Sequence, residues 1–331
     1  MDSSRRQVHV VGLFVLVMAL TSIPFVADER SDSPPPCGAT GAPPIRTVKP
    51  VTGKIACDGG KLLAFNQNGI ERYACLNLPS QALDARQPPE RKWPLVIYLH
   101  ASLTTPESLY KEGAELFALH DTYVLSNEAN VKGFIVLSPE GRRAEAWPGT
   151  KGATETGMRW DEWYRDPAAN RDAAAIDHFL DRAIATNLVD RRRVYVFGWS
   201  NGSFMAALYG VWRGDRIAAI GQYAGASPWA RPPCPVPLPA KPHVPLVLLR
   251  NLCDSVISCD DTSQWIRDLS SAGWPFESYN LWADGYEAPS TEGCSTNCTF
   301  AQGIKDHIRW PKGTVLANRL LPFFKQHELG R

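Results

Sequence analysis

Short apolar runs alternate along the chain with longer stretches in which apolar residues recur every three or four positions. Runs of four or five mostly apolar residues are typical of strands buried on both faces, and they occupy residues 95–99, 134–137, 194–197, 217–220, 246–249 and 279–282. The longer stretches predict helices over residues 170–187, 203–212, 262–272 and 315–326.

The alternation of strand and helix predicts an α/β fold with a doubly wound, mostly parallel sheet, because consecutive parallel strands need a crossover connection. Residues 56–78 predict an antiparallel hairpin instead, with Asn68-Gly69 in its turn, at the edge where the chain joins the sheet. No second linker and no internal repeat follow, so residues 48–331 are expected to form one domain.

Residues 1–27 have the three parts of a secretory signal peptide. The basic pair Arg5-Arg6 precedes an uncharged apolar run over residues 10–20. Pro24 would then end the apolar helix shortly before cleavage after Ala27. The N-terminus therefore predicts a secreted protein, extracellular or periplasmic.

An uncleaved anchor is the alternative, since residues 8–27 are long enough to span a bilayer. Either interpretation places the folded part outside the cytoplasm. Residues 28–47 are rich in Pro, Gly and Ser and are expected to form a flexible segment before the domain.

The composition is that of a soluble globular protein. Of the 331 residues, 44% are hydrophobic, 10% are aromatic and 21% are charged, with a formal net charge of +1. This balance excludes an intrinsically disordered chain, a collagen-like fibre and a multispan membrane protein. No nucleic-acid partner is expected, because binding phosphates needs an excess of Lys and Arg. Nor is a membrane partner expected for the mature chain, and the oligomeric state stays open.

The cysteine count agrees with export. All eight cysteines follow the predicted signal peptide, which predicts disulfide bonds formed in an oxidising compartment. Short separation favours the pairs Cys253–Cys259, Cys294–Cys298 and Cys57–Cys75, although many other pairings are possible. Half of a zinc site at Cys294 and Cys298 is the alternative, but no matching second pair has a similar spacing, so no metal is expected.

One serine lies between a buried strand and a helix of small, apolar residues. The segment Gly198-Trp199-Ser200-Asn201-Gly202 is a Gly-x-Ser-x-Gly sequence at a strand-to-helix turn. Such a turn strains the serine backbone and presents the hydroxyl at the edge of the sheet, and its glycines leave room where strand and helix crowd together. Ser200 is therefore the predicted nucleophile. The alternative, a glycine-rich turn of a nucleotide-binding sheet, lacks the Gly-x-Gly-x-x-Gly pattern and the phosphate-loop lysine.

A nucleophilic serine needs a histidine that takes its proton and a carboxylate that orients the histidine. In a sheet of this type the chain order is serine, acid, histidine. His307 lies in a predicted loop between the last strand and the last helix, and is the predicted base. His243 is expected at the opposite end of the sheet, and His327 is expected on the surface.

Asp254 is the predicted acid, because it directly follows the run at 246–249 and catalytic groups gather at the carboxyl ends of strands. Asp284 follows the next strand and is the rival candidate. Asp260 and Asp261 are expected to cap the helix that begins beyond them.

An oxyanion hole is predicted from backbone N–H groups. The N–H of Asn201 is one expected donor, and Ala101 or Ser102, in the loop after the run at 95–99, supplies the other. His100 in the same loop is expected to be structural, since His307 already fills the role of the base. This constellation requires no cofactor.

These segments resemble the motifs of a known family. Gly198 to Ala207, preceded by Asp190 to Val196, is similar to the Asp-x-x-Arg-Val-Tyr…Gly-Leu-Ser-Asn-Gly-Gly-Met-Met-Ala signature of secreted polyhydroxybutyrate depolymerase-like esterases. Pro94 to His100 resembles the family's Pro-Leu-Val-x-x-Leu-His-Gly strand, Asp254-Ser-Val256 its Asp-x-Val motif, and His307 to Pro311 its His-x-Trp-Pro motif. The similarity runs from about residue 56 to residue 324.

The resemblance implies the α/β-hydrolase fold, which the family shares with feruloyl and acetylxylan esterases. It also implies a secreted serine esterase with Ser200, Asp254 and His307 as its triad, and a polyhydroxyalkanoate polyester as an expected substrate. A feruloyl or acetylxylan-type esterase and a serine peptidase on the same fold are the enzymatic alternatives. An inactive hydrolase-fold binding module is the non-enzymatic alternative, because Ala101 stands where the family has a glycine.

Eleven tryptophans are many for a chain of this length. Several lie in predicted loops, where they are expected to form a stacking surface for a polymer: Trp147, Trp160, Trp163 and Trp310. Trp147, Trp199 and Trp310 are the candidate substrate-binding residues. Ordinary packing of aromatic side chains in the core is the alternative.

Overall fold

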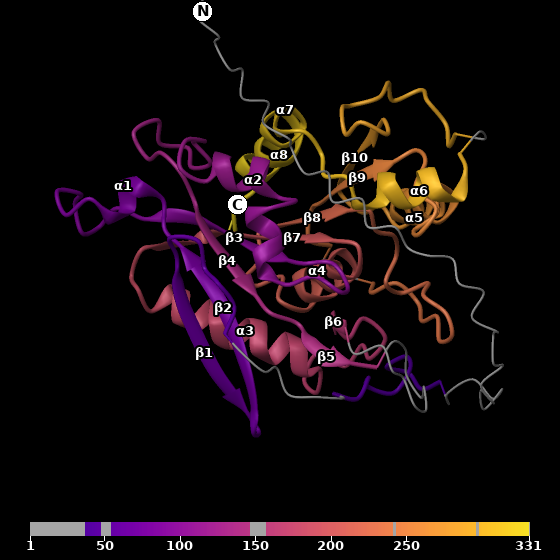
Figure 1. Cartoon of the computed structure of the whole chain (residues 1–331), viewed down its shortest axis with the longest axis horizontal. Coiled ribbons are helices and arrows are strands. Elements are labelled where there is room, and N and C mark those ends of the chain that lie inside the picture. Colours follow the sequence, from indigo (N-terminus) through magenta and orange to yellow (C-terminus); the bar gives the residue numbers. More distant parts are fainter. Residues whose placement is uncertain (1–36, 48–53, 146–156, 241–242, 296–297, 331) are drawn as a thin grey trace, which may run out of the picture. The chain divides into compact units, whose positions relative to one another are not determined.

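An eight-stranded sheet forms the centre of the domain (Figure 1). The computed structural model describes residues 37–47, 54–145, 157–240, 243–295 and 298–330, which belong to one unit, Pro34–Arg331. The predicted signal peptide, residues 1–27, lies outside the described residues. Within the described ranges, no helix has both the length and the apolar character needed to cross a bilayer.

The order of the strands across the sheet is β1-β2-β4-β3-β7-β8-β9-β10. In chain order the strands are β1 Lys61–Gln67, β2 Ile70–Asn77, β3 Trp93–Leu99, β4 Ile135–Pro139, β7 Val189–Trp199, β8 Ala219–Tyr223, β9 Leu246–Asn251 and β10 Phe276–Leu281. From β4 to β10 all neighbours run parallel, whereas β2 is antiparallel to both β1 and β4. The α/β prediction is confirmed, with its mostly parallel sheet and the antiparallel hairpin at one edge.

Helices cover both faces of the sheet (Figure 1). The longer ones are α3 Arg171–Ile184, α4 Asn201–Trp212, α5 Cys259–Ser271 and α6 Phe300–Ile308. The shorter ones are α1 Ser80–Leu83, the 3₁₀ segment η1 Pro106–Tyr110, α2 Ala114–Leu119, α7 Gly313–Val315, the π-helical segment η2 Leu316–Leu320 and α8 Leu321–Gln326.

Successive residues of the central strands point to opposite faces and so build two separate cores. Leu95 and Ile97 of β3 pack in one core with the apolar faces of α3, α4 and α5. Val96 and Tyr98 pack in the other, with residues of α2 and of the C-terminal segments α7 to α8. Because both faces are covered, the strands are apolar throughout, which is the pattern that marked them in the sequence.

All eight cysteines form disulfide bonds, which join Cys37 to Cys234, Cys57 to Cys75, Cys253 to Cys298 and Cys259 to Cys294. The predicted pair Cys57–Cys75 is confirmed. The predicted pairs Cys253–Cys259 and Cys294–Cys298 are wrong, and no zinc half-site remains at Cys294 and Cys298. Helix α5 and strand β10 intervene between the two cysteine segments and bring the second back against the first, so the bridges join segments distant in sequence.

Residues 37–47, part of the segment expected to be flexible, make specific contacts with the domain. Cys37 is bonded to Cys234, and the side chains of Ala42 and Ile45 are buried. The backbone N–H of Ile45 donates a hydrogen bond to Asp161 Oδ2 at 3.0 Å. These contacts attach the segment to the domain.

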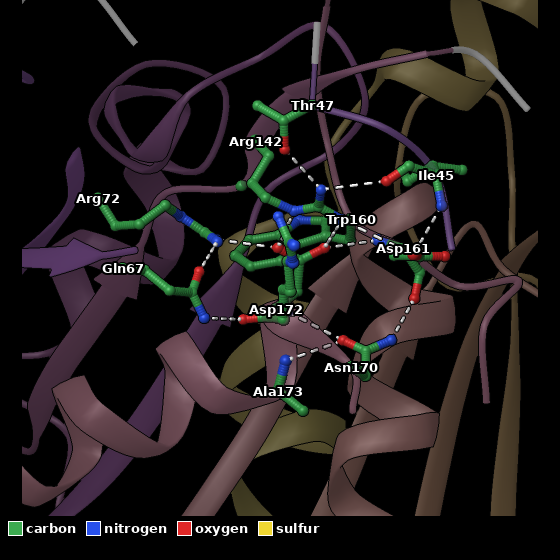
Figure 2. A network of polar contacts seen from close by, with 12 residues as sticks. Ile45, Thr47, Gln67, Arg72, Arg142, Trp160, Asp161, Asn170, Asp172 and Ala173 are labelled. Carbon is green, nitrogen blue, oxygen red and sulfur yellow. Dashed lines mark hydrogen bonds and ion pairs between the residues drawn. The ribbon is translucent and has the colours of Figure 1, made fainter. Parts of the chain in front are cut away.

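A buried ion network lies where α3 begins (Figure 2). Asp172 pairs with Arg72 of β2 at 3.0 Å and with Arg142 at 2.9 Å, and all three side chains are at most 2% exposed. Arg142 belongs to the short strand β5 (Arg142–Ala144), which pairs with β6 (Gly157–Arg159). Burial alone would raise the pKa of Asp172, but attraction to Arg142 and Arg72 outweighs burial, and its pKa is lowered.

We expect Asp172→Asn to lower the free energy of unfolding by about 3–5 kcal/mol, because it leaves the buried Arg72 without its carboxylate and Arg142 with only the longer pair to Asp161 at 3.7 Å. Chemical denaturation at neutral pH measures the change. Asp181→Asn on the same helix is the matched control. Its carboxylate is 66% exposed and pairs with Arg216, so a loss of about 0–1 kcal/mol is expected. Equal losses in the two variants would contradict the network's role.

The same network predicts acid sensitivity. Because the pKa of Asp172 is lower in the folded than in the unfolded protein, its stabilising contribution is present above the unfolded value of about 4 and is lost as the pH falls further. Denaturation between pH 5 and about pH 2 should therefore show a smaller acid-induced loss of stability in Asp172→Asn than in the wild type.

Candidate active site

Ser200 lies in the turn between β7 and α4, with φ 54° and ψ −121°. This φ is in the left-handed region, which costs energy for a residue other than glycine. The turn is tight enough to exclude side chains on either side. A Cβ at Gly198 would lie 2.0 Å from the carbonyl oxygen of Gly202, and a Cβ at Gly202 would lie 2.2 Å from that of Leu99. The strain predicted for Ser200 and the need for both glycines are therefore present in the structure.

The three residues predicted as a triad lie within hydrogen-bonding distance. Ser200 Oγ is 2.8 Å from His307 Nε2, and His307 Nδ1 is 2.7 Å from Asp254 Oδ2. Since a carboxylate only accepts, we assign the ring proton to Nδ1, which leaves the lone pair of Nε2 facing the serine hydroxyl. The three residues are buried but keep some access to solvent. Their exposed fractions are 8% for Ser200, 7% for Asp254 and 6% for His307.

Asp254 is held in place by its own loop. Its Oδ1 accepts hydrogen bonds from the backbone N–H groups of Val256 at 2.8 Å and Ile257 at 2.9 Å. These two bonds leave Oδ2 for the histidine. The loop follows the carboxyl end of β9, as the sequence predicts for the acid.

His307 lies in helix α6, not in the predicted loop. The helix is tied to the Asp254 loop twice: the Cys253–Cys298 bond joins the residues just before each, and Ser255 Oγ donates to the carbonyl oxygen of Phe300. At the C-terminal end of α6, the carbonyl oxygen of His307 accepts a hydrogen bond from Trp199 Nε1 at 3.1 Å. His307 is thus fixed relative to both Asp254 and the turn that contains Ser200.

The residues predicted for the oxyanion hole lie at the same edge of the sheet. Asn201 is the first residue of α4, so its backbone N–H lies before the repeating hydrogen bonds of the helix. Ala101 and Ser102 follow the carboxyl end of β3. Within the described part of the chain, neither the N–H of Ala101 nor the N–H of Ser102 donates a hydrogen bond to a backbone oxygen.

His100 is buried and makes only structural bonds. Its Nδ1 is 2.8 Å from the carbonyl oxygen of Ala101, and its Nε2 accepts from the backbone N–H of Gly141 at 2.9 Å. Burial lowers the pKa of His100 to about 4, so the ring is neutral at ordinary pH. This agrees with the expectation of a structural role.

The expected aromatic stacking surface is wrong for the tryptophans that the structure describes. Trp160, Trp163, Trp199 and Trp310 are all less than 7% exposed. Trp310 packs in the core against Tyr98, Phe197 and Trp199, and Trp199 holds the end of α6. A large aromatic side chain gains most from burial, and loop residues are buried here because other segments cover them. The third candidate, Trp147, lies outside the described residues.

The rival residues lie in other surroundings. Asp284 Oδ1 accepts from the backbone N–H of Tyr286, and His243 stacks on Trp274. The cap of α5 is Ser258, not the predicted Asp260 and Asp261, which occupy the first turn.

In the described residues, no group of three or more His, Cys, Asp and Glu side chains is placed to hold a metal ion.

Solved structures with a similar fold include several esterases. A ferulic acid esterase matches with a TM-score of 0.51 at 15% identity, over 81% of this chain and 98% of that one. A thermostable esterase matches with a TM-score of 0.47 at 13% identity; the match covers 82% of this chain but only 64% of that protein. Esterase 2 of Thermogutta terrifontis, phosphorylated by paraoxon, matches with a TM-score of 0.44 at 10% identity, over 76% and 92% of the two chains. No family model and no curated protein sequence matches this chain.

The bridge Cys253–Cys298 should matter to the reactivity of Ser200. We expect replacement of both cysteines by serine to slow phosphonylation of Ser200 by a fluorophosphonate about 10- to 100-fold, because the acid and the histidine lose a common anchor. The matched control replaces Cys57 and Cys75, whose bridge ties the β1–β2 hairpin to the segment before it. Its labelling rate should stay within about twofold of wild type once both proteins are shown to be folded. Equal rates in the two variants would contradict this expectation.

Proposed function

We propose that this protein is a secreted serine hydrolase that cleaves carboxylic esters. The observation that carries the proposal is the chain of two hydrogen bonds from Ser200 through His307 to Asp254, at 2.8 and 2.7 Å. A serine, a histidine of defined tautomer and a fixed carboxylate are the groups needed to turn an alcohol into a nucleophile. The fold supports the proposal, because Ser200 and Asp254 follow the carboxyl ends of parallel strands β7 and β9, the edge at which such sites occur.

In the proposed reaction Ser200 Oγ bonds to the ester carbonyl carbon while its proton passes to His307 Nε2. The carbonyl oxygen takes the negative charge, opposite the N–H groups of Asn201 and of Ala101 or Ser102. The proton on Nε2 then passes to the leaving alkoxide, which departs as the alcohol. His307 then removes a proton from a water molecule, whose oxygen bonds to the acyl carbon. The bond between that carbon and Ser200 Oγ breaks, Oγ takes the proton back from His307, and the carboxylic acid is released. Asp254 stabilises the imidazolium throughout.

The proposed location rests on the disulfide bonds and the N-terminus. Four disulfide bonds are expected in a protein that folds in an oxidising compartment. A basic residue pair followed by an apolar run at the N-terminus is the signature of export.

For the substrate we propose an ester with apolar chains, such as a polyhydroxyalkanoate polyester. Exposed aliphatic side chains neighbour the reactive groups in the chain: Leu103 follows Ser102, Ile308 follows His307, and Val256 is two residues beyond Asp254. Phe300 and Ile304 continue the apolar face of α6 at four-residue spacing, with exposed fractions of 71% and 38%. Apolar groups exposed around a reactive centre favour an apolar substrate over a sugar-rich one.

The first test is Ser200→Ala, which should lower kcat on p-nitrophenyl butyrate about 10⁴- to 10⁶-fold and abolish fluorophosphonate labelling while the protein stays folded. Asp254→Asn should cost about 10⁴-fold, because the histidine loses the group that fixes its tautomer. Unchanged turnover in Ser200→Ala would exclude Ser200 as the nucleophile.

The same assays separate the alternatives. A wild-type protein that takes no label at Ser200 would favour a non-catalytic binding module. Turnover of aminoacyl p-nitroanilides faster than of matched esters would favour a peptidase. Faster release from methyl ferulate or acetylated xylan than from polyhydroxybutyrate film would favour those esters as the substrates.

A second test removes the apolar face of α6. We expect the double variant Phe300→Ser, Ile304→Ser to lose about 5- to 30-fold in kcat/KM on p-nitrophenyl decanoate and on polyhydroxybutyrate film, from the lost burial of apolar area. Its kcat/KM on p-nitrophenyl acetate should change by less than about twofold. Leu83→Ser is the control, since Leu83 is 66% exposed but lies in α1. An equal loss on acetate and decanoate would contradict the proposed docking face.

A further inference from the structure

Trp160 connects the parts of the site that carry the proposed oxyanion hole. It immediately follows β6 and is fully buried. Its backbone N–H donates to Asn201 Oδ1 at 2.7 Å, and its carbonyl oxygen accepts from Asn201 Nδ2 at 3.1 Å. Its indole Nε1–H donates to the carbonyl oxygen of His100 at 2.8 Å. One residue therefore holds both the start of α4 and the loop after β3.

The indole bond fixes the direction of a backbone N–H group. In a trans peptide the carbonyl and the N–H of one unit point in opposite directions in one plane. Since His100 O points at the indole of Trp160, the N–H of Ala101 points away from Trp160. The next peptide is held in the same manner, because Ala101 O accepts from Thr104 Oγ1 at 2.9 Å and lies 2.8 Å from His100 Nδ1. This fixes the N–H of Ser102.

The loop has a second attachment to the same strand. The backbone N–H of Leu103 donates to the carbonyl oxygen of Met158 at 2.8 Å. The loop at residues 100–103 is therefore held on both sides of Ala101 and Ser102, by Met158 of β6 and by Trp160, which follows β6. The ring of His100 also lies against the indole of Trp160, with centroids 5.1 Å apart.

Trp160 is itself anchored in the buried ion network (Figure 2). The next residue, Asp161, donates its backbone N–H to Asp172 Oδ2 at 2.7 Å. Its carbonyl oxygen accepts from Asn170 Nδ2 at 2.9 Å. Asp172 in turn is held by Arg142 and Arg72. Buried, paired charges of this kind form a rigid support, because moving them apart would leave a buried charge without its partner.

We propose that Trp160 is the positioning residue of the oxyanion hole: it sets the separation and direction of the N–H groups of Asn201 and of the Ala101–Ser102 loop. The inference rests on the proposed function and extends it to a residue whose hydrogen bonds reach Asn201 and His100. An oxyanion hole acts only when its donors are already oriented, so the effect is on the transition state and not on substrate binding.

The test compares Trp160→Phe with Trp163→Phe. Both replace a buried indole three residues apart in the same segment, but only Trp160 donates to the loop after β3. On p-nitrophenyl butyrate, Trp160→Phe should lower kcat about 10- to 100-fold and leave KM within about twofold. Trp163→Phe should stay within about twofold of wild type in both constants.

A transition-state analogue adds a readout that a structural defect would not reproduce. A trifluoromethyl ketone is attacked by Ser200 Oγ, the proton moves to His307, and the ketone oxygen becomes an oxyanion in the hole. Its inhibition constant should rise in Trp160→Phe by about the factor by which kcat/KM falls. An unchanged inhibition constant, or a rise in KM at constant kcat, would overturn the proposal.

Incorporation of β-(3-benzothienyl)alanine at position 160 covers the case in which Trp160→Phe does not fold. This analogue keeps the shape of the indole and replaces only the N–H by sulfur. Wild-type kcat in that protein would overturn the proposal, and a loss matched by weaker inhibition would support it. A wild-type protein that fails to react with fluorophosphonate would instead overturn the proposed function itself, so the two failures are distinguishable.

Discussion

The close approach of the β7–α4 turn to the end of β3 is the constraint on which the site depends. Gly202 lies so near the carbonyl oxygens of Leu99 and His100 that any side chain there would overlap them. This contact places the nucleophile helix directly against the loop that carries Ala101 and Ser102. It also holds Ser200 in its left-handed conformation, since the turn has no room to relax. The positions of the hydroxyl and of the nearby N–H groups are therefore two results of one packing contact.

Covalent and ionic links, in addition to apolar packing, bring groups from distant parts of the chain to this turn. The bond between Cys253 and Cys298 couples the Asp254 loop to α6, so that acid and histidine move together. On the other side of the turn, Asp172 and its two arginines support the segment that contains Trp160. Links of this kind specify geometry more narrowly than apolar contacts, because hydrogen bonds and disulfides are directional.

The distribution of apolar side chains separates the core from the proposed substrate face. The tryptophans that composition suggested as a binding surface fill the interior, where Trp160 and Trp199 use their indole N–H groups to fix backbone carbonyls. Several exposed apolar side chains belong instead to the segments that carry Asp254, His307 and the loop after β3: Leu103, Val256, Phe300, Ile304 and Ile308. A buried indole N–H usually finds a hydrogen-bond partner, and those of Trp160 and Trp199 do.

The sequence by itself determined the features that depend on neighbours within a few residues. The strands could be recognised because a strand covered on both faces must be apolar throughout, and the strained turn at Ser200 because only glycine fits at Gly198 and Gly202. The chain order, together with the positions of Asp254 and His307 relative to the predicted strands, selected residues that the structure brings into contact with Ser200. Only the tertiary structure decided the pairing of Cys253 with Cys298, the placement of His307 in a helix, and the burial of Trp160 against His100. Each of these is a contact between segments far apart in the chain, and no local pattern of residues encodes which distant segment will cover a given side chain.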